Sequence, residues 1–89
     1  MKKYYLEFMH QSEKEFLSLP RLIQKMIKEK MDFFLMADNP LKFAKKLHGN
    51  KNIFRFRIGD YRVLVTLKNK GVLAILLILK IGHRRDVYE

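Results

Sequence analysis

The chain has 89 residues, which suits one domain with a modest core, so we predict a single domain spanning residues 1–89. It has no cysteine, and its three scattered histidines lack ligand spacing, so we expect no metal and no small-molecule cofactor. The longest apolar run, Val72 to Leu79, is too short to span a bilayer as a helix, and the first ten residues lack the apolar region of a signal peptide. We therefore expect a soluble, cytoplasmic protein without a membrane partner.

The formal net charge of +10 is concentrated in the second half of the chain. Residues 1–41 carry seven Lys or Arg against six Asp or Glu, whereas residues 42–85 carry twelve against one. Such an excess indicates an anionic partner. A nucleic acid is the preferred candidate, followed by an acidic protein and then a membrane surface. The alternative is a merely solvated surface, but such a surface normally mixes the two signs.

The first half of the chain predicts one strand and a helical hairpin. Residues 3–9 are short and rich in aromatic residues, as in a strand. Ser12 and Glu15 have the spacing of a capping box, which predicts that a short helix starts there. Pro20 suits the first turn of a second helix, whose apolar residues recur at helical spacing until the Asp-Asn-Pro sequence at 38–40.

The second half predicts an antiparallel meander of three strands. Residues 40–52 form a basic connector with room for one helical turn. Strands are expected at 53–58, 61–67 and 72–81, joined by a two-residue Gly59-Asp60 turn and a four-residue turn at 68–71. The last strand is apolar on both faces, as expected of a central strand. The predicted fold class is α+β, with the N-terminal strand and the meander in one sheet packed on the helical hairpin.

Pairing across the Gly59-Asp60 turn places three arginines on one face of the sheet. Arg57 should face Arg62, and Arg55 should lie beside them, opposite Leu64. The other face should be apolar and covered by the helices; it consists of Phe54, Phe56, Ile58, Tyr61, Val63 and Val65. Like charges paired across strands repel, but an arginine fork donates two parallel hydrogen bonds to phosphate oxygens. We therefore predict an exposed phosphate-binding face, the alternative being arginines that only solvate the sheet.

The expected register of the last strand brings the C-terminal segment to the same end of the sheet. With a four-residue turn at 68–71, Tyr61 lies opposite Ile78. Residues 82–85 would then overhang the sheet end that carries Arg62. The sequence therefore predicts that the positive charges converge at this end.

His83 is the candidate for proton transfer within this segment. An imidazole exchanges a proton near neutral pH, which no arginine does. We expect His83 to lie close to Arg62, Arg84 and Tyr88, and that company distinguishes it from a solvated loop histidine.

Two stretches together resemble the RelE/ParE superfamily of bacterial and archaeal toxins, in particular its RelE-like branch. They are LHGNKNIFRFRIGDYRVLV at 47–65 and LLILKIGHRRDVYE at 76–89. The matching signature is a Leu-x-Gly before the sheet, an aromatic-Arg-x-Arg strand, Gly-Asp-Tyr-Arg, and a closing Gly-His-Arg-x-Asp-Val-Tyr. The order of strand, two helices and sheet agrees with the same superfamily.

The resemblance implies a toxin of a type II toxin–antitoxin system, held inactive by a cognate acidic antitoxin. RelE-like members act on the ribosome with messenger RNA in the A site, and they cut that RNA without a metal. The 2′-hydroxyl attacks the adjacent phosphate and leaves a 2′,3′-cyclic phosphate and a 5′-hydroxyl. The expected activity is therefore that of a metal-independent endoribonuclease that inhibits translation.

The resemblance also implies roles for individual residues. Catalytic positions are Arg62, expected on the scissile phosphate, His83, Arg84, and Tyr88, expected to stack on or orient a nucleotide or to assist acid/base chemistry. Positions that bind RNA phosphates are Lys51, Arg55, Arg57 and Arg85. Some relatives have lysines where this chain has Arg55 and Arg57, and an arginine practically cannot lose its proton, so His83 is the better candidate for proton transfer, as acid or as base.

Two other functions compete with this hypothesis. A ParE-like toxin would bind DNA gyrase and cut nothing itself. A noncatalytic RNA-binding module would use the same basic face, with Tyr61 or Tyr88 stacking on bases. The ribonuclease is favoured by the combination of Arg57, Arg62, His83, Arg84 and Tyr88.

Overall fold

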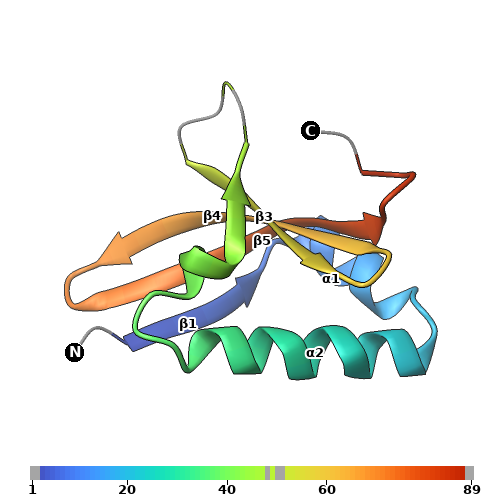
Figure 1. Ribbon diagram of the computed structural model, residues 1–89, viewed down its shortest axis with the longest axis horizontal. Coiled ribbons are helices and arrows are strands. Elements are labelled where there is room, and N and C mark those ends of the chain that lie inside the picture. Colours follow the sequence, from blue (N-terminus) through green and yellow to red (C-terminus); the bar gives the residue numbers. More distant parts are fainter. Residues whose placement is uncertain (1–2, 48, 50–51, 88–89) are drawn as a thin grey trace.

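One five-stranded sheet with two helices on one face makes up the fold of the computed structural model, which describes residues 3–47, 49 and 52–87 (Figure 1). The elements are β1 (Lys3–Phe8), α1 (His10–Leu17), α2 (Arg21–Leu35), the 3₁₀ helix η1 (Pro40–Phe43), β2 (Ala44–Lys46), β3 (Ile53–Ile58), β4 (Tyr61–Lys70) and β5 (Leu73–His83). The strand order is β1-β5-β4-β3-β2, with β1 parallel to β5 and the other neighbours antiparallel. The α+β prediction is confirmed. Across the described ranges, no helix is long and apolar enough to cross a membrane.

The main core lies between α2 and the sheet. Ile27, Met31 and Phe34 recur on α2 at helical spacing and are buried against the strands. The aromatic rings of Phe34 and Phe56 stack with their centroids 5.0 Å apart. The apolar face predicted for β3 and β4 is confirmed: Phe56, Ile58, Val63 and Val65 are buried in this core, and Phe54 and Tyr61 pack against it.

The connector before β3 contains a strand that the sequence did not reveal. Asn39 Oδ1 accepts a hydrogen bond from the Leu41 N–H at 3.2 Å and so caps η1, which is the helical turn allowed by the sequence. The chain then returns along β3 as β2, with Lys45 opposite Arg55. A strand of three residues is too short to show an alternating pattern, so this connector was only partly predicted.

The turn between β4 and β5 is shorter than expected. The strands continue to Lys70 and resume at Leu73, so the turn is the pair Gly71-Val72 rather than four residues. Gly71 has φ +61°, a conformation that favours glycine and allows so tight a reversal. The polar residues at 68–70 resemble a loop, but they belong to the strand.

The register of β5 is therefore shifted relative to the sequence prediction. Besides the shorter turn, the pairing jumps between Leu64 and Val65, where β5 carries one extra residue as a β-bulge. Tyr61 lies opposite His83, and the predicted pairing of Tyr61 with Ile78 is wrong.

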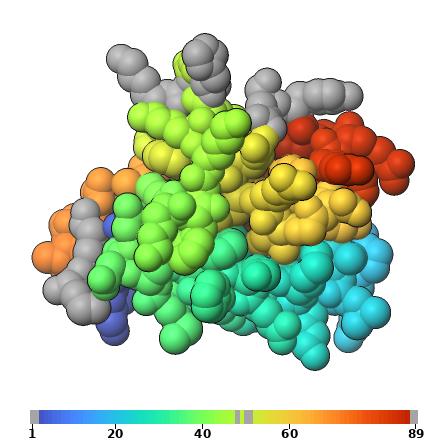
Figure 2. Space-filling model, viewed as in Figure 1, coloured from blue at the N-terminus to red at the C-terminus, as the bar shows by residue number. Residues whose placement is uncertain are grey.

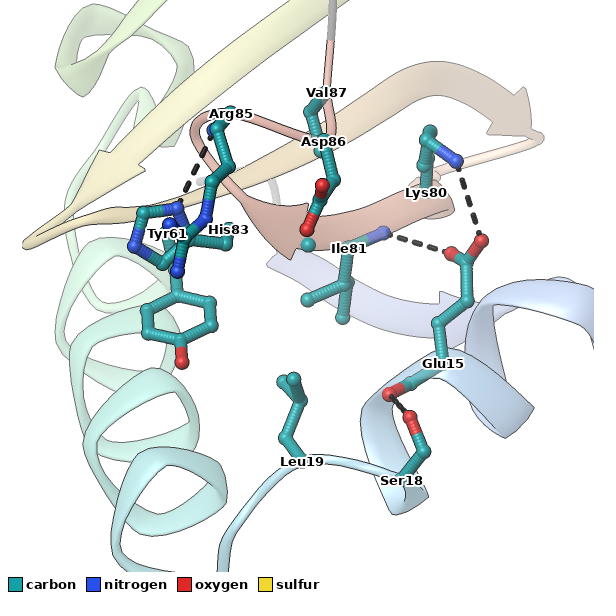
Figure 3. Close-up of a pocket in the computed structure, with 11 residues that line it drawn as sticks. Glu15, Ser18, Leu19, Tyr61, Lys80, Ile81, His83, Arg85, Asp86 and Val87 are labelled. Carbon is teal, nitrogen blue, oxygen red and sulfur yellow. Dashed lines mark hydrogen bonds and ion pairs between the residues drawn. The ribbon is translucent and has the colours of Figure 1, made fainter.

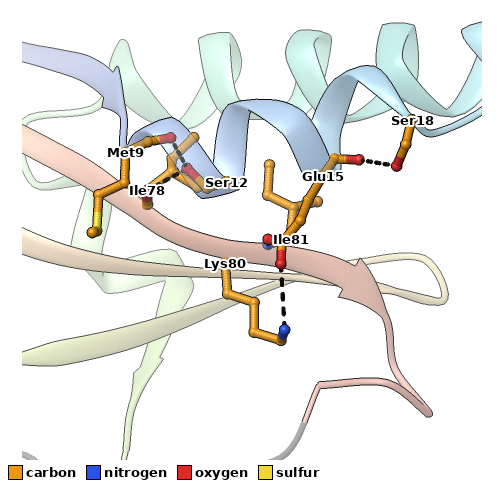
Figure 4. A network of polar contacts seen from close by, with 7 residues as sticks. All are labelled: Met9, Ser12, Glu15, Ser18, Ile78, Lys80 and Ile81. Carbon is orange, nitrogen blue, oxygen red and sulfur yellow. Dashed lines mark hydrogen bonds and ion pairs between the residues drawn. The ribbon is translucent and has the colours of Figure 1, made fainter.

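Ser12 and Glu15 do not form a capping box, as Figure 4 shows. Helix α1 already begins at His10, so both side chains lie within it, one turn apart, and face the edge of β5 that β1 leaves uncovered. Ser12 is fully buried, and its Oγ lies 2.7 Å from the Ile78 carbonyl oxygen. The Ile81 N–H donates to Glu15 Oε1 at 3.0 Å. Glu15 thus satisfies the backbone of β5 in place of a neighbouring strand, and Ser12 adds a second donor to the Ile78 carbonyl, which also accepts the Met9 N–H at 3.0 Å.

The edge contact of Ser12 should be measurable in the stability of the protein. Ser12→Ala should lower the free energy of unfolding by about 1–2 kcal/mol, because a buried hydrogen bond to the β5 backbone is lost. Ser18→Ala is the matched control, since its exposed Oγ bonds only the Glu15 carbonyl of the same helix. Urea denaturation of both variants gives the comparison, and equal losses would contradict the assigned role of Ser12.

Candidate nucleic-acid interface

Basic side chains gather on the face of the sheet that is turned away from α2. Strand pairing puts Lys45 and Arg55 in one row of the sheet and Arg57 and Arg62 in the next. We call these four residues the arginine face. Figure 2 shows the surface over β2 and β3 next to the C-terminal residues, on the side of the molecule opposite α2. The predicted grouping of three arginines is confirmed, and Lys45 joins them through β2.

The three arginines differ in exposure. Arg57 is exposed and Arg55 is half-buried, but Arg62 is only 9% exposed. Arg62 Nη1 donates to the carbonyl oxygens of Gly59, at 3.0 Å, and Tyr61, at 2.9 Å. The expectation that all three arginines are exposed is therefore wrong for Arg62, because its guanidinium folds back onto the β3–β4 turn.

The β3–β4 turn is the two-residue Gly59-Asp60 turn predicted from the sequence, flanked by the pair Ile58 and Tyr61. Gly59 has φ +58°, so the position favours glycine. Arg62 holds the carbonyl groups on both sides of Asp60 and thereby fixes the shape of this turn.

A second, smaller apolar cluster lies on the same side of the sheet as the arginine face. Leu64, which pairs with Arg55, packs with Leu47 and Val87. The chain after β5 folds back far enough that a Cβ built on Gly82 would lie 3.0 Å from Val87 Cγ2. Glycine at position 82 therefore provides the space in which Val87 anchors the C-terminal segment.

Arg84 is held at the same turn as Arg62. Its backbone N–H donates to the Asp60 carbonyl oxygen at 2.7 Å, and its Nε lies 3.9 Å from Asp60 Oδ1. The side chains of Arg84 and Asp60 are largely exposed. The Gly59-Asp60 turn thus brings the cationic groups of Arg62 and Arg84 to one end of the sheet, as predicted.

The positive charges of this cluster act on one another. Burial lowers the pKa of Arg62, and the neighbouring charges of Arg57, Arg55 and Arg84 lower it further, while Asp60 opposes the shift. The cationic form of Arg62 is thus destabilised by burial and by its neighbours. A bound anion such as an RNA phosphate would stabilise that form.

His83 does not lie beside Arg62. It pairs with Tyr61 and shares the helix side of the sheet with it, whereas Arg62 points to the opposite side. The two rings meet edge to face with centroids 5.4 Å apart, and His83 Nδ1 accepts a hydrogen bond from the Arg85 N–H at 3.3 Å. The sequence placed His83 among the arginines because the register of β5 was predicted wrongly.

His83 opens instead onto a pocket of about 360 Å³, which we call the His83 pocket (Figure 3). It is lined by Glu15, Ser18, Leu19, Tyr61, Lys80, Ile81, Gly82, His83, Arg85, Asp86 and Val87. In Figure 3, His83 and Arg85 lie beside Tyr61, and Lys80 and Glu15 stand on the opposite side. Arg85, predicted to bind phosphate, belongs to this pocket and not to the arginine face.

Two predicted site residues, Lys51 and Tyr88, lie outside the described residues. The part of the chain that the structure describes contains no group of three His, Cys, Asp or Glu side chains that could hold a metal ion. The described functional groups at this end of the sheet are thus mainly arginine side chains, together with the imidazole of His83 and the carboxylates of Glu15, Asp60 and Asp86.

The sequence and the fold are similar to known toxins. The model of a family described as the ParE toxin of the parDE type II toxin–antitoxin system matches residues 6–88. The RelBE2 toxin–antitoxin complex from Mycobacterium tuberculosis has a chain that is 26% identical, with a TM-score of 0.72 and coverage of 94% of each chain. The archaeal RelE–RelB complex from Pyrococcus horikoshii matches at 28% identity and a TM-score of 0.66, covering 92% of this chain and 96% of that one.

The intact RelBE toxin–antitoxin complex of E. coli is also similar, at 20% identity and a TM-score of 0.71, and the alignment covers 90% of this chain and 95% of that one. No curated protein sequence gives a significant match.

Arg57 and Arg62 form a matched pair, since they lie opposite each other but differ in burial. Arg62→Ala should lower the free energy of unfolding by about 1–3 kcal/mol, because two carbonyl groups lose a charged donor. Arg57→Ala should change it by less than about 0.5 kcal/mol, because an exposed like charge is removed. Urea denaturation of both variants tests this. A loss for Arg57→Ala as large as for Arg62→Ala would refute the anchoring role.

Proposed function

Because the chain belongs to the RelE/ParE superfamily and is a toxin of a type II toxin–antitoxin system, we propose that it is a ribosome-dependent endoribonuclease that cuts messenger RNA in the A site. The observation that carries the proposal is the arginine face, where Arg57 and Arg62 lie side by side and Arg84 is tied to the same turn. Like charges at this spacing cost free energy unless an anion joins them. RNA supplies such anions at regular intervals.

The proposed reaction is transfer of the phosphate within the RNA. The 2′-oxygen attacks the adjacent phosphorus, the bond to the 5′-oxygen breaks, and the products carry a 2′,3′-cyclic phosphate and a 5′-hydroxyl. The phosphorane formed on the way carries extra negative charge, which Arg62 and Arg84 would stabilise. Arg55 and Arg57 would hold flanking phosphates, and Lys51 is a further candidate for such a contact.

A proton must leave the 2′-hydroxyl, and another must reach the 5′-oxygen. His83 follows Gly82, which pairs with Arg62, so His83 lies at the same end of the sheet as the arginine face, with its side chain on the opposite side of the sheet. Since Nδ1 accepts the Arg85 N–H, Nε2 is the ring nitrogen that remains for substrate. RNA that bends around this end would bring a ribose to His83, while Tyr88 stays a candidate for positioning the nucleotide.

The proposed partners are the ribosome with messenger RNA in the A site and an acidic antitoxin. The similar structures from E. coli, M. tuberculosis and P. horikoshii are toxin–antitoxin complexes, which supports a cognate antitoxin. The excess of positive charge at 42–85 supports the acidic character of that partner.

The second candidate function is inhibition of DNA gyrase. It is favoured by the family description, which names the ParE toxin. A gyrase inhibitor needs a protein-docking surface and does not require arginines that converge on a phosphate. The two candidates therefore differ in which process stops first after the toxin is made.

Pulse-labelling after brief induction separates these functions. Incorporation of amino acids should fall before incorporation of thymidine, because the message is cut on the ribosome. Arg57→Ala, which should stay folded, should delay or abolish this effect through loss of an exposed phosphate ligand. Arrest of DNA synthesis first would identify a gyrase inhibitor, and arrest of neither by a folded, expressed protein would leave only a binding module.

A proton-transfer role of His83 predicts a kinetic effect. His83→Gln should reduce the single-turnover cleavage of ribosome-bound message by roughly two to four orders of magnitude, while RNA binding barely changes. Near wild-type cutting by His83→Gln would assign the proton transfer to Tyr88 or to ribosomal RNA.

A further inference from the structure

Apart from His83, the lining of the His83 pocket has no role in the phosphate chemistry proposed above. The pocket lies at the edge of β5, lined by residues from both sides of the sheet, and its volume of about 360 Å³ falls within the range of small-molecule sites. Its lining combines flat and apolar surface, from Tyr61, Ile81 and Leu19, with charged groups at its edge. Such a mixture suits a planar, polar heterocycle more than an isolated anion.

The two carboxylates of the lining are not equivalent. Glu15 accepts the Ile81 N–H at 3.0 Å and lies 3.4 Å from Lys80 Nζ, so its carboxylate holds the edge of β5. Asp86 is exposed, and the hydrogen bond from its own N–H to the His83 carbonyl, at 2.8 Å, fixes the turn that carries it. Figure 3 shows its carboxylate pointing into the pocket. Asp86 is therefore the hydrogen-bond acceptor that the pocket offers to a ligand.

The donors of the pocket stand across from this acceptor. The Arg85 backbone is tied to His83 Nδ1, and in Figure 3 its side chain extends beside Tyr61. A ligand lying along Tyr61 would thus meet the Asp86 carboxylate and the Arg85 guanidinium. Among the RNA bases, guanine carries adjacent N1–H and N2–H₂ donors next to acceptors at O6 and N7, which matches this arrangement.

We propose that the His83 pocket binds a guanine base of the RNA strand whose phosphates lie on the arginine face, with Asp86 accepting from N1–H and N2–H₂ and Arg85 donating to O6 or N7. The proposal rests on the proposed function for its substrate. The strand would pass around the end of the sheet, with His83 at the boundary between phosphate and base. The pocket would then determine which nucleotide is selected at the cut.

Nucleotide binding tests the pocket without any cleavage. Guanosine 5′-monophosphate should bind the purified protein about tenfold more tightly than adenosine 5′-monophosphate, since a bidentate contact discriminates bases on this scale. Because both carry the same phosphate, the ratio reports the base alone. Inosine 5′-monophosphate, which lacks N2–H₂, should fall between them. The NMR shift changes that differ between the two nucleotides should fall on Leu19, Ile81 and Asp86.

Asp86→Asn should abolish the preference for guanosine 5′-monophosphate over adenosine 5′-monophosphate, because an amide cannot accept from both donors of guanine. Asp38→Asn is the matched control, an exposed carboxylate outside the pocket, and should keep it. Equal affinities for the two nucleotides in the wild type, or a ratio unchanged in Asp86→Asn, would overturn the proposal.

Mapping of cut sites on ribosome-bound message separates this inference from the proposed function. Wild-type protein should favour cuts beside guanine, and Asp86→Asn should cut with less preference. Cutting with the same preference by both proteins would refute guanine binding in the pocket but would still support the ribonuclease activity. If the wild type cuts nothing, the proposed function fails, and the nucleotide titration still decides whether the pocket binds guanine.

Discussion

Insertion of β5 between β1 and β4 is the constraint on which the rest of the structure depends. The strand pairs in parallel with β1 and antiparallel with β4, and its residues Ala74, Leu76, Ile78 and Ile81 are buried. Where β1 ends, Ser12 and Glu15 of α1 continue to satisfy its backbone. The strand is therefore supported along its whole length, and the residues that follow it start from a fixed position.

The register of β5 determines which side chains lie on each face of the sheet at the end that carries Arg62 and His83. The bulge and the tight Gly71-Val72 turn set the register in which Gly82 meets Arg62 and His83 meets Tyr61. The arginines consequently collect on one side of the sheet, while the imidazole of His83 points to the other, toward Tyr61. A change of one residue in that register would turn the side chains of β5, including His83, to the opposite face of the sheet.

Local patterns in the sequence predicted the elements well, and contacts between distant elements account for the failures. The Gly59-Asp60 turn has a strong local signal, so the pairing of Arg57 with Arg62 and the apolar face of β3 and β4 could be predicted. Residues 68–70 look like a loop, and only pairing with β5 makes them a strand. The spacing of Ser12 and Glu15 is common to a capping box and to one helical turn facing a strand edge, and only the position of β5 distinguishes them.

The same limit applies to the candidate site. Arginines at 55, 57 and 62 could be placed on one face from alternation and the two-residue turn, but the burial of Arg62 depends on carbonyl groups of the turn. Lys45 joins the face only because η1 returns the chain along β3. The His83 pocket draws residues from α1, β4, β5 and the C-terminal segment, a combination that no single stretch of sequence displays.

The central place of β5 also affects how the protein can be made. A nascent chain that stops before residue 73 has β1 and β4 without the strand that joins them, and its apolar helices have half a sheet to cover. Such a fragment lacks the core residues Leu76, Ile78 and Ile81 and the hydrogen bond between Arg84 and Asp60. Messenger RNA broken anywhere upstream of this strand therefore encodes only inactive pieces. If the toxin cuts messages as proposed, damage to its own transcript upstream of β5 would stop the production of more toxin without leaving a complete fold.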